Sequence, residues 1–262
     1  MNIGFIGAGN MGGALARAIS KVSGTKVYIY DISIEKARNF ASEIGARAAD
    51  FCEVVSSSDI LFLGVKPNIL PEVCQSVGKI AKSDSVIVSM AAGTTISSIE
   101  NALSRKLSII RIMPNTPVLV GEGFTAYAKN ELVTDGKLSD FLSAMQYTGT
   151  LEALSEDEID SFCAIAGCGP AYAYTFIDAL ARGAEKCGIS RENAIRYAAL
   201  TVRGATRMTL DTKTSPETLC KNVCSPGGAT IEGVKVLDSG DFKATVSSAI
   251  EAAFKRTKEL GK

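Results

Sequence analysis

The chain has 262 residues, and its 28 basic side chains balance 28 acidic ones, so the formal net charge is zero. A balanced charge without a long basic run predicts no nucleic-acid partner, and no apolar stretch approaches the roughly 20 residues that cross a membrane. The sequence has no histidine, which excludes imidazole zinc sites, Ser-His-Asp triads and dehydrogenases whose proton donor is a histidine.

An apolar run that ends at Ile6 predicts a first strand, and Gly7-x-Gly9-x-x-Gly12 then leads into a helix. Gly7 permits the tight turn, Gly9 lets the backbone approach a pyrophosphate, and Gly12 lets the helix pack closely on the strand. Without its context this spacing would be only a glycine-rich turn. Between a strand and a helix it favours a dinucleotide-binding turn.

Up to about residue 153, short apolar runs alternate with helical stretches. Further strands are predicted over 26–30, 60–65, 85–89 and 107–113. This alternation is typical of a doubly wound, Rossmann-like parallel α/β sheet, and we assign 1–154 to a dinucleotide-binding domain. Asp31 follows the second strand, at about the 20-residue offset where an acid accepts hydrogen bonds from an adenosine ribose.

Three segments follow the later strands, where ligands of an open α/β sheet bind. They are Val65-Lys66-Pro67, Ala91-Ala92-Gly93-Thr94 and Met113-Pro114-Asn115-Thr116-Pro117. Their small residues and prolines let the backbone come close to a flat ring. Each segment by itself is also compatible with a plain strand-to-helix turn.

From residue 155 onward, strand signals vanish and helical stripes replace them. Ser155 and Glu158 form a predicted capping box, Ser190 can cap a second helix, and Ser215 precedes Pro216 as a further N-cap. We predict an all-α domain over 155–262 with about five helices. Its apolar surface exceeds what a small bundle buries, which favours a homodimer over packing against its own first domain alone.

The helical half also contains Ser225-Pro226-Gly227-Gly228-Ala229-Thr230 before a predicted helix. Two glycines at a helix start expose N–H donors that attract a carboxylate, and Thr230 adds a hydroxyl. The segment predicts a site for a small anionic substrate. Alone, it would be only a Pro-Gly turn that caps a helix.

Taken together, these motifs resemble pyrroline-5-carboxylate reductase, which reduces a cyclic imine to proline with a nicotinamide cofactor. The resemblance covers nearly the whole chain and rests on residues 5–12, Val65-Lys66-Pro67, Ala91-Ala92-Gly93, 113–117, Gly169-Pro170-Ala171-Tyr172 and 225–230. It departs from the usual pattern at Cys168, where serine is common, and at Gly64, where alanine is common. Both changes are small substitutions that remove no functional group.

The resemblance implies NADPH or NADH as cofactor and a homodimer formed by the helical domain, often assembled further. It assigns the cofactor to Gly7, Gly9, Asn10, Met11, Gly12, Asp31, Val65, Lys66, Pro67, Ala91, Ala92, Gly93, Asn115 and Pro117. It assigns the substrate carboxylate to Ser225, Gly227, Gly228, Ala229 and Thr230, with the Thr230 hydroxyl near the imine nitrogen. A protonated imine is already electrophilic, so such a reduction needs no histidine.

Cofactor preference depends on the residues around Asp31. A carboxylate there accepts hydrogen bonds from a free ribose and repels a ribose phosphate, which favours NADH. Ser33, Lys36 and Arg38 lie close in sequence and can still accommodate NADPH. The sequence therefore leans toward NADH with some use of NADPH.

Two other functions remain open at this stage. The β-hydroxyacid dehydrogenases share a two-domain plan and use a helix-borne lysine, but their Gly-x-x-x-Asn-x-x-Lys pattern is absent, which leaves Lys186 and Lys221 as candidates. A dinucleotide-binding sensor without catalysis is also compatible with the spacing.

Cysteine usage bears on the cellular location. The seven cysteines are an odd number, and none forms a Cys-x-x-Cys pair, so neither disulfides nor a metal site is predicted. Thiols in a reducing compartment fit this pattern. The first predicted strand begins at residue 2, which leaves no room for a preceding signal segment. We expect a cytoplasmic protein.

Overall fold

The computed structural model describes residues 1–260 and divides into two compact units. The first comprises Met1–Cys168 together with the chain from Ala253 onward, and the second comprises Gly169–Ala252. The domain boundary that we place after residue 154 stays a prediction. In the structure the first unit extends to Cys168, because the short helix α7 (Ile159–Phe162) packs on the sheet of that unit.

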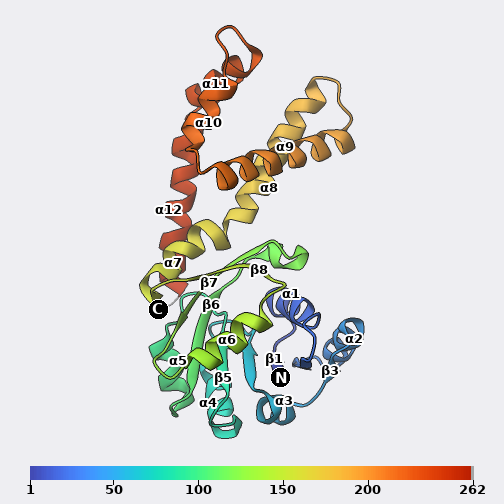
Figure 1. Ribbon diagram of the computed structural model, residues 1–262, viewed down its shortest axis with the longest axis vertical. Coiled ribbons are helices and arrows are strands. Elements are labelled where there is room, and N and C mark those ends of the chain that lie inside the picture. The colour runs from blue at the N-terminus through green and yellow to red at the C-terminus, as the bar shows by residue number, and fades with distance from the viewer. Residues whose placement is uncertain (261–262) are drawn as a thin grey trace. The chain divides into compact units, whose positions relative to one another are not determined.

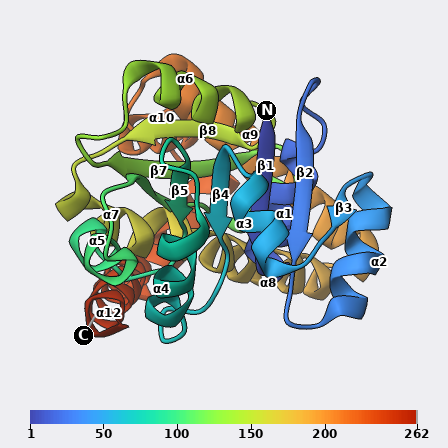
Figure 2. The ribbon, with the colours of Figure 1, turned by 90° about the horizontal axis from the view of Figure 1, so that it is seen from below.

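Within residues 1–260, the first unit contains one sheet of eight strands in the order β3-β2-β1-β4-β5-β6-β7-β8 (Figures 1 and 2). The strands are β1 (Asn2–Ile6), β2 (Lys26–Tyr30), β3 (Arg47–Ala48), β4 (Ile60–Leu63), β5 (Val86–Ser89), β6 (Ser108–Met113), β7 (Gly123–Lys129) and β8 (Gly149–Ala153). All neighbours pair in parallel except β6 and β7, which are antiparallel. The predicted doubly wound fold class is thus confirmed.

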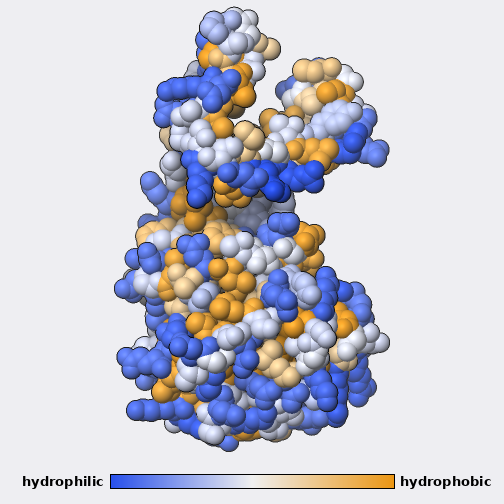
Figure 3. Space-filling view, in the orientation of Figure 1, coloured by the Kyte–Doolittle hydropathy of each residue, from blue (hydrophilic) through white to orange (hydrophobic). Residues whose placement is uncertain are grey.

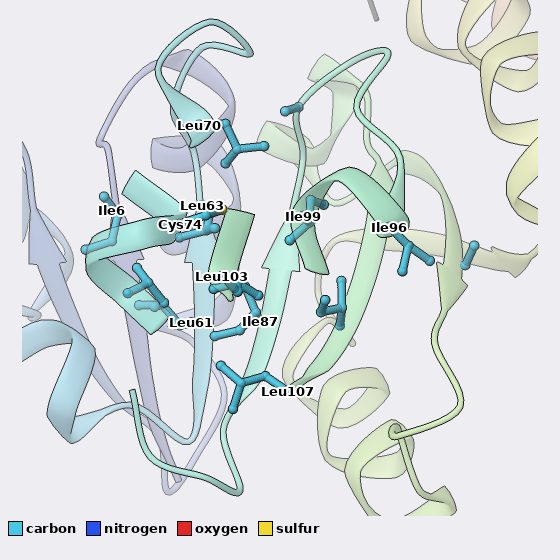
Figure 4. Packing of buried hydrophobic residues seen from close by; sticks show 14 of the residues in the cluster. Ile6, Leu61, Leu63, Leu70, Cys74, Ile87, Ile96, Ile99, Leu103 and Leu107 are labelled. Carbon is cyan, nitrogen blue, oxygen red and sulfur yellow. The ribbon is translucent and has the colours of Figure 1, made fainter. Parts of the chain in front are cut away.

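Helices cover both faces of this sheet because its central strands are apolar on both sides. One buried cluster joins the sheet to α3 (Phe51–Ser57), α4 (Leu70–Ile80), α5 (Ile96–Leu103) and α7, as Figure 4 shows for Leu63, Cys74 and Leu103. The opposite cluster joins it to α1 (Asn10–Ile19), α2 (Ile34–Ile44) and α6 (Asp135–Ala144). Strands β1, β4, β5 and β6 are therefore fixed from both sides, and so are the loops at their carboxyl ends.

Short helical turns complete the first unit. They are the 3-10 helices η1 (Thr116–Val120) and η2 (Glu156–Glu158) and the π-helical turn η3 (Cys163–Gly167). The capping box that we predict for Ser155 and Glu158 is present at η2.

Helix starts in the first unit differ in one way that matters for ligand binding. Side chains of Ser33, Asp50, Thr95 and Thr134 accept a backbone hydrogen bond at the starts of α2, α3, α5 and α6. Helix α1 is preceded instead by Gly9 and has no side-chain cap. Its first N–H groups therefore have no protein side chain as acceptor.

The second unit consists of helices and has little core of its own. It contains α8 (Gly169–Lys186), α9 (Arg191–Thr212), α10 (Pro216–Val223), α11 (Ala229–Ser239) and the first part of α12 (Phe242–Leu260). Both predicted helix starts are present: Ser190 precedes α9, although its side chain makes no cap hydrogen bond, and the side chain of Ser215 caps α10.

Within Gly169–Ala252, all of which the structure describes, the buried apolar side chains are three alanines: Ala181, Ala194 and Ala198. Larger apolar side chains lie on the surface of the single chain, where Figure 3 shows them among polar ones; Leu210 and Val236 are 70% and 69% exposed. Such a unit needs a second surface to bury its apolar side chains. In neither unit does a helix among residues 1–260 have the length and hydropathy to cross a membrane.

Candidate cofactor and substrate sites

The glycine turn between β1 and α1 is packed so closely that two of its positions cannot carry a side chain. Gly7 has φ +98 and donates its N–H to the Tyr30 carbonyl at 2.8 Å. A Cβ on Gly12 would lie 2.4 Å from the Gly7 carbonyl oxygen, and one on Gly64 would lie 2.9 Å from it. The absence of side chains thus brings β1, α1 and the end of β4 together.

Gly9 is different, because a Cβ there would meet no atom within 4 Å. Packing therefore does not require glycine at this position, and the space in front of it is open. The first turn of α1, formed by Asn10, Met11 and Gly12, has no acidic residue and no side-chain cap. This geometry fits the phosphates of a dinucleotide, since free N–H groups at a helix start bind anions.

A cavity of about 600 Å³ extends from this turn along the carboxyl ends of β1, β2 and β4. It brings together five of the predicted cofactor residues, which are Gly7, Gly9, Asp31, Val65 and Lys66. Further lining residues that sequence reasoning did not select include Tyr30, Ile32, Phe51 and Ile69. A mixed wall of apolar rings and glycine backbone is typical of a nucleotide groove.

Asp31 is held firmly at the end of β2. Its carboxylate accepts the N–H groups of Ala8 at 2.9 Å and Ser33 at 3.1 Å, and the Lys36 ammonium lies 3.5 Å away. Burial alone would raise the pKa of Asp31, but the two backbone hydrogen bonds and the charge of Lys36 outweigh it and lower the pKa. The side chain therefore enters the groove as an ionised, oriented acceptor.

Lys36 modifies the argument for NADH. It lies in the first turn of α2, its side chain is half exposed, and its ammonium partly balances the Asp31 charge. A cation beside the carboxylate offsets the repulsion that a ribose phosphate would meet. The preference for NADH stays a prediction.

Two further predicted loops lie at neighbouring strand ends. Between β4 and α4, the exposed Lys66 accepts the N–H groups of Ile69 and Leu70 on its carbonyl, which fixes the Val65-Lys66-Pro67 backbone. Between β5 and α5, Ala91 is buried, Ala92 is half-buried and Gly93 turns the chain with φ +72.

Asn115 holds the loop after β6 by its side chain. It is 7% exposed, donates from Nδ2 to the Ala166 carbonyl at 2.9 Å and accepts the Phe124 N–H on Oδ1 at 2.9 Å. Ala166 lies in the π-helical turn η3, and Pro170, four residues later, has no N–H to donate to its carbonyl. Asn115 thus supplies the donor that a continuous helix would have taken from residue 170, while Pro117 lies in the first turn of η1 beside it.

An ion-pair network around a buried arginine joins β6 to η2 and α7, and sequence reasoning missed it. Arg111 of β6 is 2% exposed and contacts Glu156 at 3.2 Å and Asp160 at 2.7 Å. Glu156 also accepts the Ile96 N–H at 2.6 Å at the start of α5. The only signal in the sequence is a single arginine inside the apolar run Ser108–Met113. The network fixes the start of α5, directly after the Ala91–Gly93 segment.

The predicted substrate loop belongs to the second unit. Gly227 has φ +70, and the Gly228 N–H donates to the Ser225 carbonyl at 3.0 Å. Gly228 then precedes α11, which has no side-chain cap, and Thr230 is exposed in the first turn of that helix. The loop is an uncapped helix start with a hydroxyl beside it, which suits a carboxylate. That this loop and the glycine turn share one cleft stays a prediction.

The two departures from the usual motifs have different surroundings. Gly64 lies against the Gly7 carbonyl, where the space for a methyl group is short by a few tenths of an ångström. Cys168 ends the π-helical turn and donates its N–H to the Cys163 carbonyl at 3.0 Å. Among residues 1–260, no group of three or more histidine, cysteine or acidic side chains is placed to hold a metal ion.

Comparison with known proteins agrees with this geometry in both units. Residues 156–260 match the family described as pyrroline-5-carboxylate reductase dimerisation, and residues 2–93 match the family described as NADP oxidoreductase, coenzyme F420-dependent. The chain is 41% identical to bovine pyrroline-5-carboxylate reductase 2 over 99% of its own length and 84% of that protein's. It is 37% identical to the pyrroline-5-carboxylate reductase of Escherichia coli over 99% of this chain and 98% of that protein.

Solved structures give the same result. The crystal structure of Plasmodium falciparum pyrroline carboxylate reductase with NADP bound superposes with a TM-score of 0.91 at 31% identity, covering 100% of this chain and 98% of that one. The likeness includes both the sheet unit and the helical unit. The resemblance found in the sequence is confirmed, and the chain belongs to the pyrroline-5-carboxylate reductase family.

Proposed function

We propose that this protein reduces 1-pyrroline-5-carboxylate to L-proline with NADPH or NADH, the last step of proline biosynthesis. The observation that carries the proposal is likeness to named reductases along 99% of the chain, including both the glycine turn and the Ser225–Thr230 loop. Neither the β-hydroxyacid dehydrogenase alternative nor the sensor alternative has a comparable observation in its favour.

The first unit would hold the cofactor through backbone more than side chains. The N–H groups at the start of α1 face the open space at Gly9 and suit the pyrophosphate, and Asp31 is an oriented acceptor for the adenosine ribose. The loops that contain Val65, Ala92 and Asn115 lie at the strand ends that follow, where they suit the nicotinamide half. When bound, the nicotinamide supplies the hydride.

The second unit would hold the substrate. The N–H groups at the start of α11 bind the carboxylate, and Gly227 and Gly228 leave them without a covering side chain. The Thr230 hydroxyl oxygen accepts a hydrogen bond from the protonated ring nitrogen, which holds the proton of the imine in place. A positively charged imine needs orientation more than acid–base help, so a chain without histidine is sufficient.

The helical unit pairs with that of a second copy in this proposal. The match to a dimerisation family and the exposed apolar side chains of Gly169–Ala252 support a homodimer. The family resemblance supports further assembly of dimers, which light scattering of the purified protein tests. A cytoplasmic location is supported by the seven cysteines, all of them free thiols.

One set of assays tests the function. The purified protein is given reduced cofactor with 1-pyrroline-5-carboxylate, and separately oxidised cofactor with small hydroxyacids. Cofactor oxidation that requires the imine, with proline as product, is the expected result. Hydroxyacid-dependent cofactor reduction would instead assign the dehydrogenase activity, and cofactor binding without any turnover would assign the sensor.

A further inference from the structure

Two cysteines lie one helical turn apart just before the substrate loop. Cys220 is in the last turns of α10, and Cys224 directly follows that helix and precedes Ser225. Both are free thiols; Cys220 is exposed in the single chain and Cys224 is half-buried. They are the two cysteines of the chain at a spacing of four residues.

The spacing brings the two sulfur atoms close but leaves a disulfide incomplete. Residues four apart on a helix have Cβ atoms about 5–6 Å apart, whereas a disulfide needs a Cβ separation of about 3.5–4.5 Å. Closure of a bond would therefore require one residue to move by about 1–2 Å. Cys224 is the residue able to move, because it lies outside the helix with φ −98 and ψ 93. The movement would strain the hydrogen bond from its N–H to the Lys221 carbonyl, which is 3.1 Å long.

The surroundings of Cys224 keep its thiol protonated more than an ordinary cysteine, so ring closure by its thiolate should be faster at alkaline pH. Partial burial, a hydrogen bond with Cys220 and the charge of that neighbouring sulfur raise the pKa of Cys224. The hydrogen bond and charge of Asp238, 3.0 Å away, raise the pKa of Lys243, with smaller contributions from Cys220 and Glu217. The Lys243 ammonium is thus held mainly by Asp238.

We propose that Cys220 and Cys224 form an oxidisable dithiol site that reacts with small organic disulfides and whose closure displaces the substrate loop. The Cys220 thiolate attacks one sulfur of the disulfide, forms a mixed disulfide and releases one thiolate. The Cys224 thiolate then attacks the Cys220 sulfur and releases the second. Two protein thiols are oxidised, one external disulfide is reduced to two thiols, and the two protons go to the released thiolates.

Closure acts on the loop through the backbone. Cys224 is bonded to Ser225, whose carbonyl accepts the Gly228 N–H, and the turn between them depends on φ +70 at Gly227. A movement of Cys224 therefore changes the position of the N–H groups that begin α11. This consequence rests on the proposed function, because it assumes that these groups bind the substrate carboxylate.

The test uses the purified full-length protein incubated with glutathione disulfide and analysed by mass spectrometry and kinetics. We expect the wild type to lose two hydrogens, with one peptide linking Cys220 to Cys224, and Cys224→Ser to retain a glutathionyl group on Cys220. Oxidised wild type should lose on the order of tenfold in kcat/KM for the imine, as expected for a group misplaced by about 1 Å or more. Dithiothreitol should restore it. Cys187→Ser, which changes an exposed cysteine elsewhere in the second unit, is the matched control and should respond as the wild type does.

Three results would overturn the proposal. The first is absence of the Cys220–Cys224 peptide from oxidised protein. The second is an unchanged kcat/KM once that peptide has formed. The third is a loss of kcat/KM in Cys220→Ser after treatment with glutathione disulfide that equals the loss in the treated wild type. That result would assign the effect to another cysteine. Peptide mapping detects the disulfide whether or not the protein is catalytically active. If the protein with free thiols never consumes the imine, that result refutes the proposed function and leaves the disulfide proposal untouched.

Discussion

The contact between Asn115 and Ala166 leads to a prediction whose size follows from the structure. Asn115→Ala removes both hydrogen bonds of a side chain that is 7% exposed and leaves the Ala166 carbonyl and the Phe124 N–H without partners. A buried polar group left unpaired costs about 1–3 kcal/mol. The two groups together should therefore lower the free energy of unfolding by about 2–6 kcal/mol.

The explanation through Pro170 makes a sharper test possible. If Asn115 replaces the N–H that Pro170 lacks, then Pro170→Ala offers the Ala166 carbonyl a new donor. In that background, the loss of unfolding free energy caused by Asn115→Ala should be smaller by about 1 kcal/mol. Unfolding in urea is followed by far-UV circular dichroism, since the chain has no tryptophan to report it by fluorescence. Asn115→Asp keeps an acceptor for Phe124 but no donor for Ala166, so it should be destabilised as well.

The outcome can refute this reasoning in two ways. Equal destabilisation by Asn115→Ala in the wild-type and Pro170→Ala backgrounds would show that residue 170 and Asn115 do not serve the same carbonyl. Weaker NADPH binding at unchanged stability would show that the Asn115 side chain contacts the cofactor rather than the protein. Calorimetric titration with NADPH measures the second quantity directly.

Four further outcomes are expected. Gly9→Ala should weaken NADPH binding about tenfold, or about 1.4 kcal/mol, because its methyl group fills the open space at the start of α1. Gly13→Ala, whose Cβ meets only ordinary contacts, should bind NADPH as the wild type does. Equal titration curves for the two variants would contradict this prediction. Asp31→Ser should shift the ratio of kcat/KM values toward NADPH, and an unchanged ratio would remove Asp31 from cofactor selection. Thr230→Ala should lower turnover about tenfold or more, and wild-type turnover in a folded variant would refute its assignment. The pKa of Asp31 in the folded protein lies below the ordinary 3.8, so its contribution to the free energy of unfolding is complete well above that pH and is lost as the pH falls through the folded pKa. The difference in unfolding free energy between wild type and Asp31→Asn should therefore shrink in acid. A difference that persists in acid would contradict this prediction.

The central strands and the glycine turn could be predicted because their signals are local. The predicted strand over 60–65, for example, contains β4 (Ile60–Leu63), which is buried throughout because helices cover both faces of the sheet. Strand β8 is not among the predicted strands, since its residues 149–153 are half-buried or exposed at the sheet edge and include Glu152. Its neighbour β7 runs antiparallel to β6, a reversal that an alternation of strands and helices does not indicate.

The candidate sites show the same division between local and distant information. Gly7, Gly9 and Asp31 could be selected by spacing, and they line one cavity. The roles of Asn115 and Arg111 could not, because their partners Ala166 and Asp160 lie 51 and 49 residues away in the sequence. Only the π-helical turn and the start of α7, once folded, present those partners.

The return of the chain to the first unit has a practical consequence. Residues from Ala253 onward belong to that unit, where Thr257 is buried and its hydroxyl lies 3.9 Å from the Cys163 sulfur. The helical unit is therefore an insertion with two connections, at 168–169 and 252–253. A protease that cleaves at 168–169 leaves the helical unit covalently joined only to the chain from Ala253 onward, which belongs to the first unit by packing alone. A chain truncated after residue 168 lacks the last helical turns of the first unit. A chimaera that exchanges the helical unit with that of a relative therefore needs two junctions.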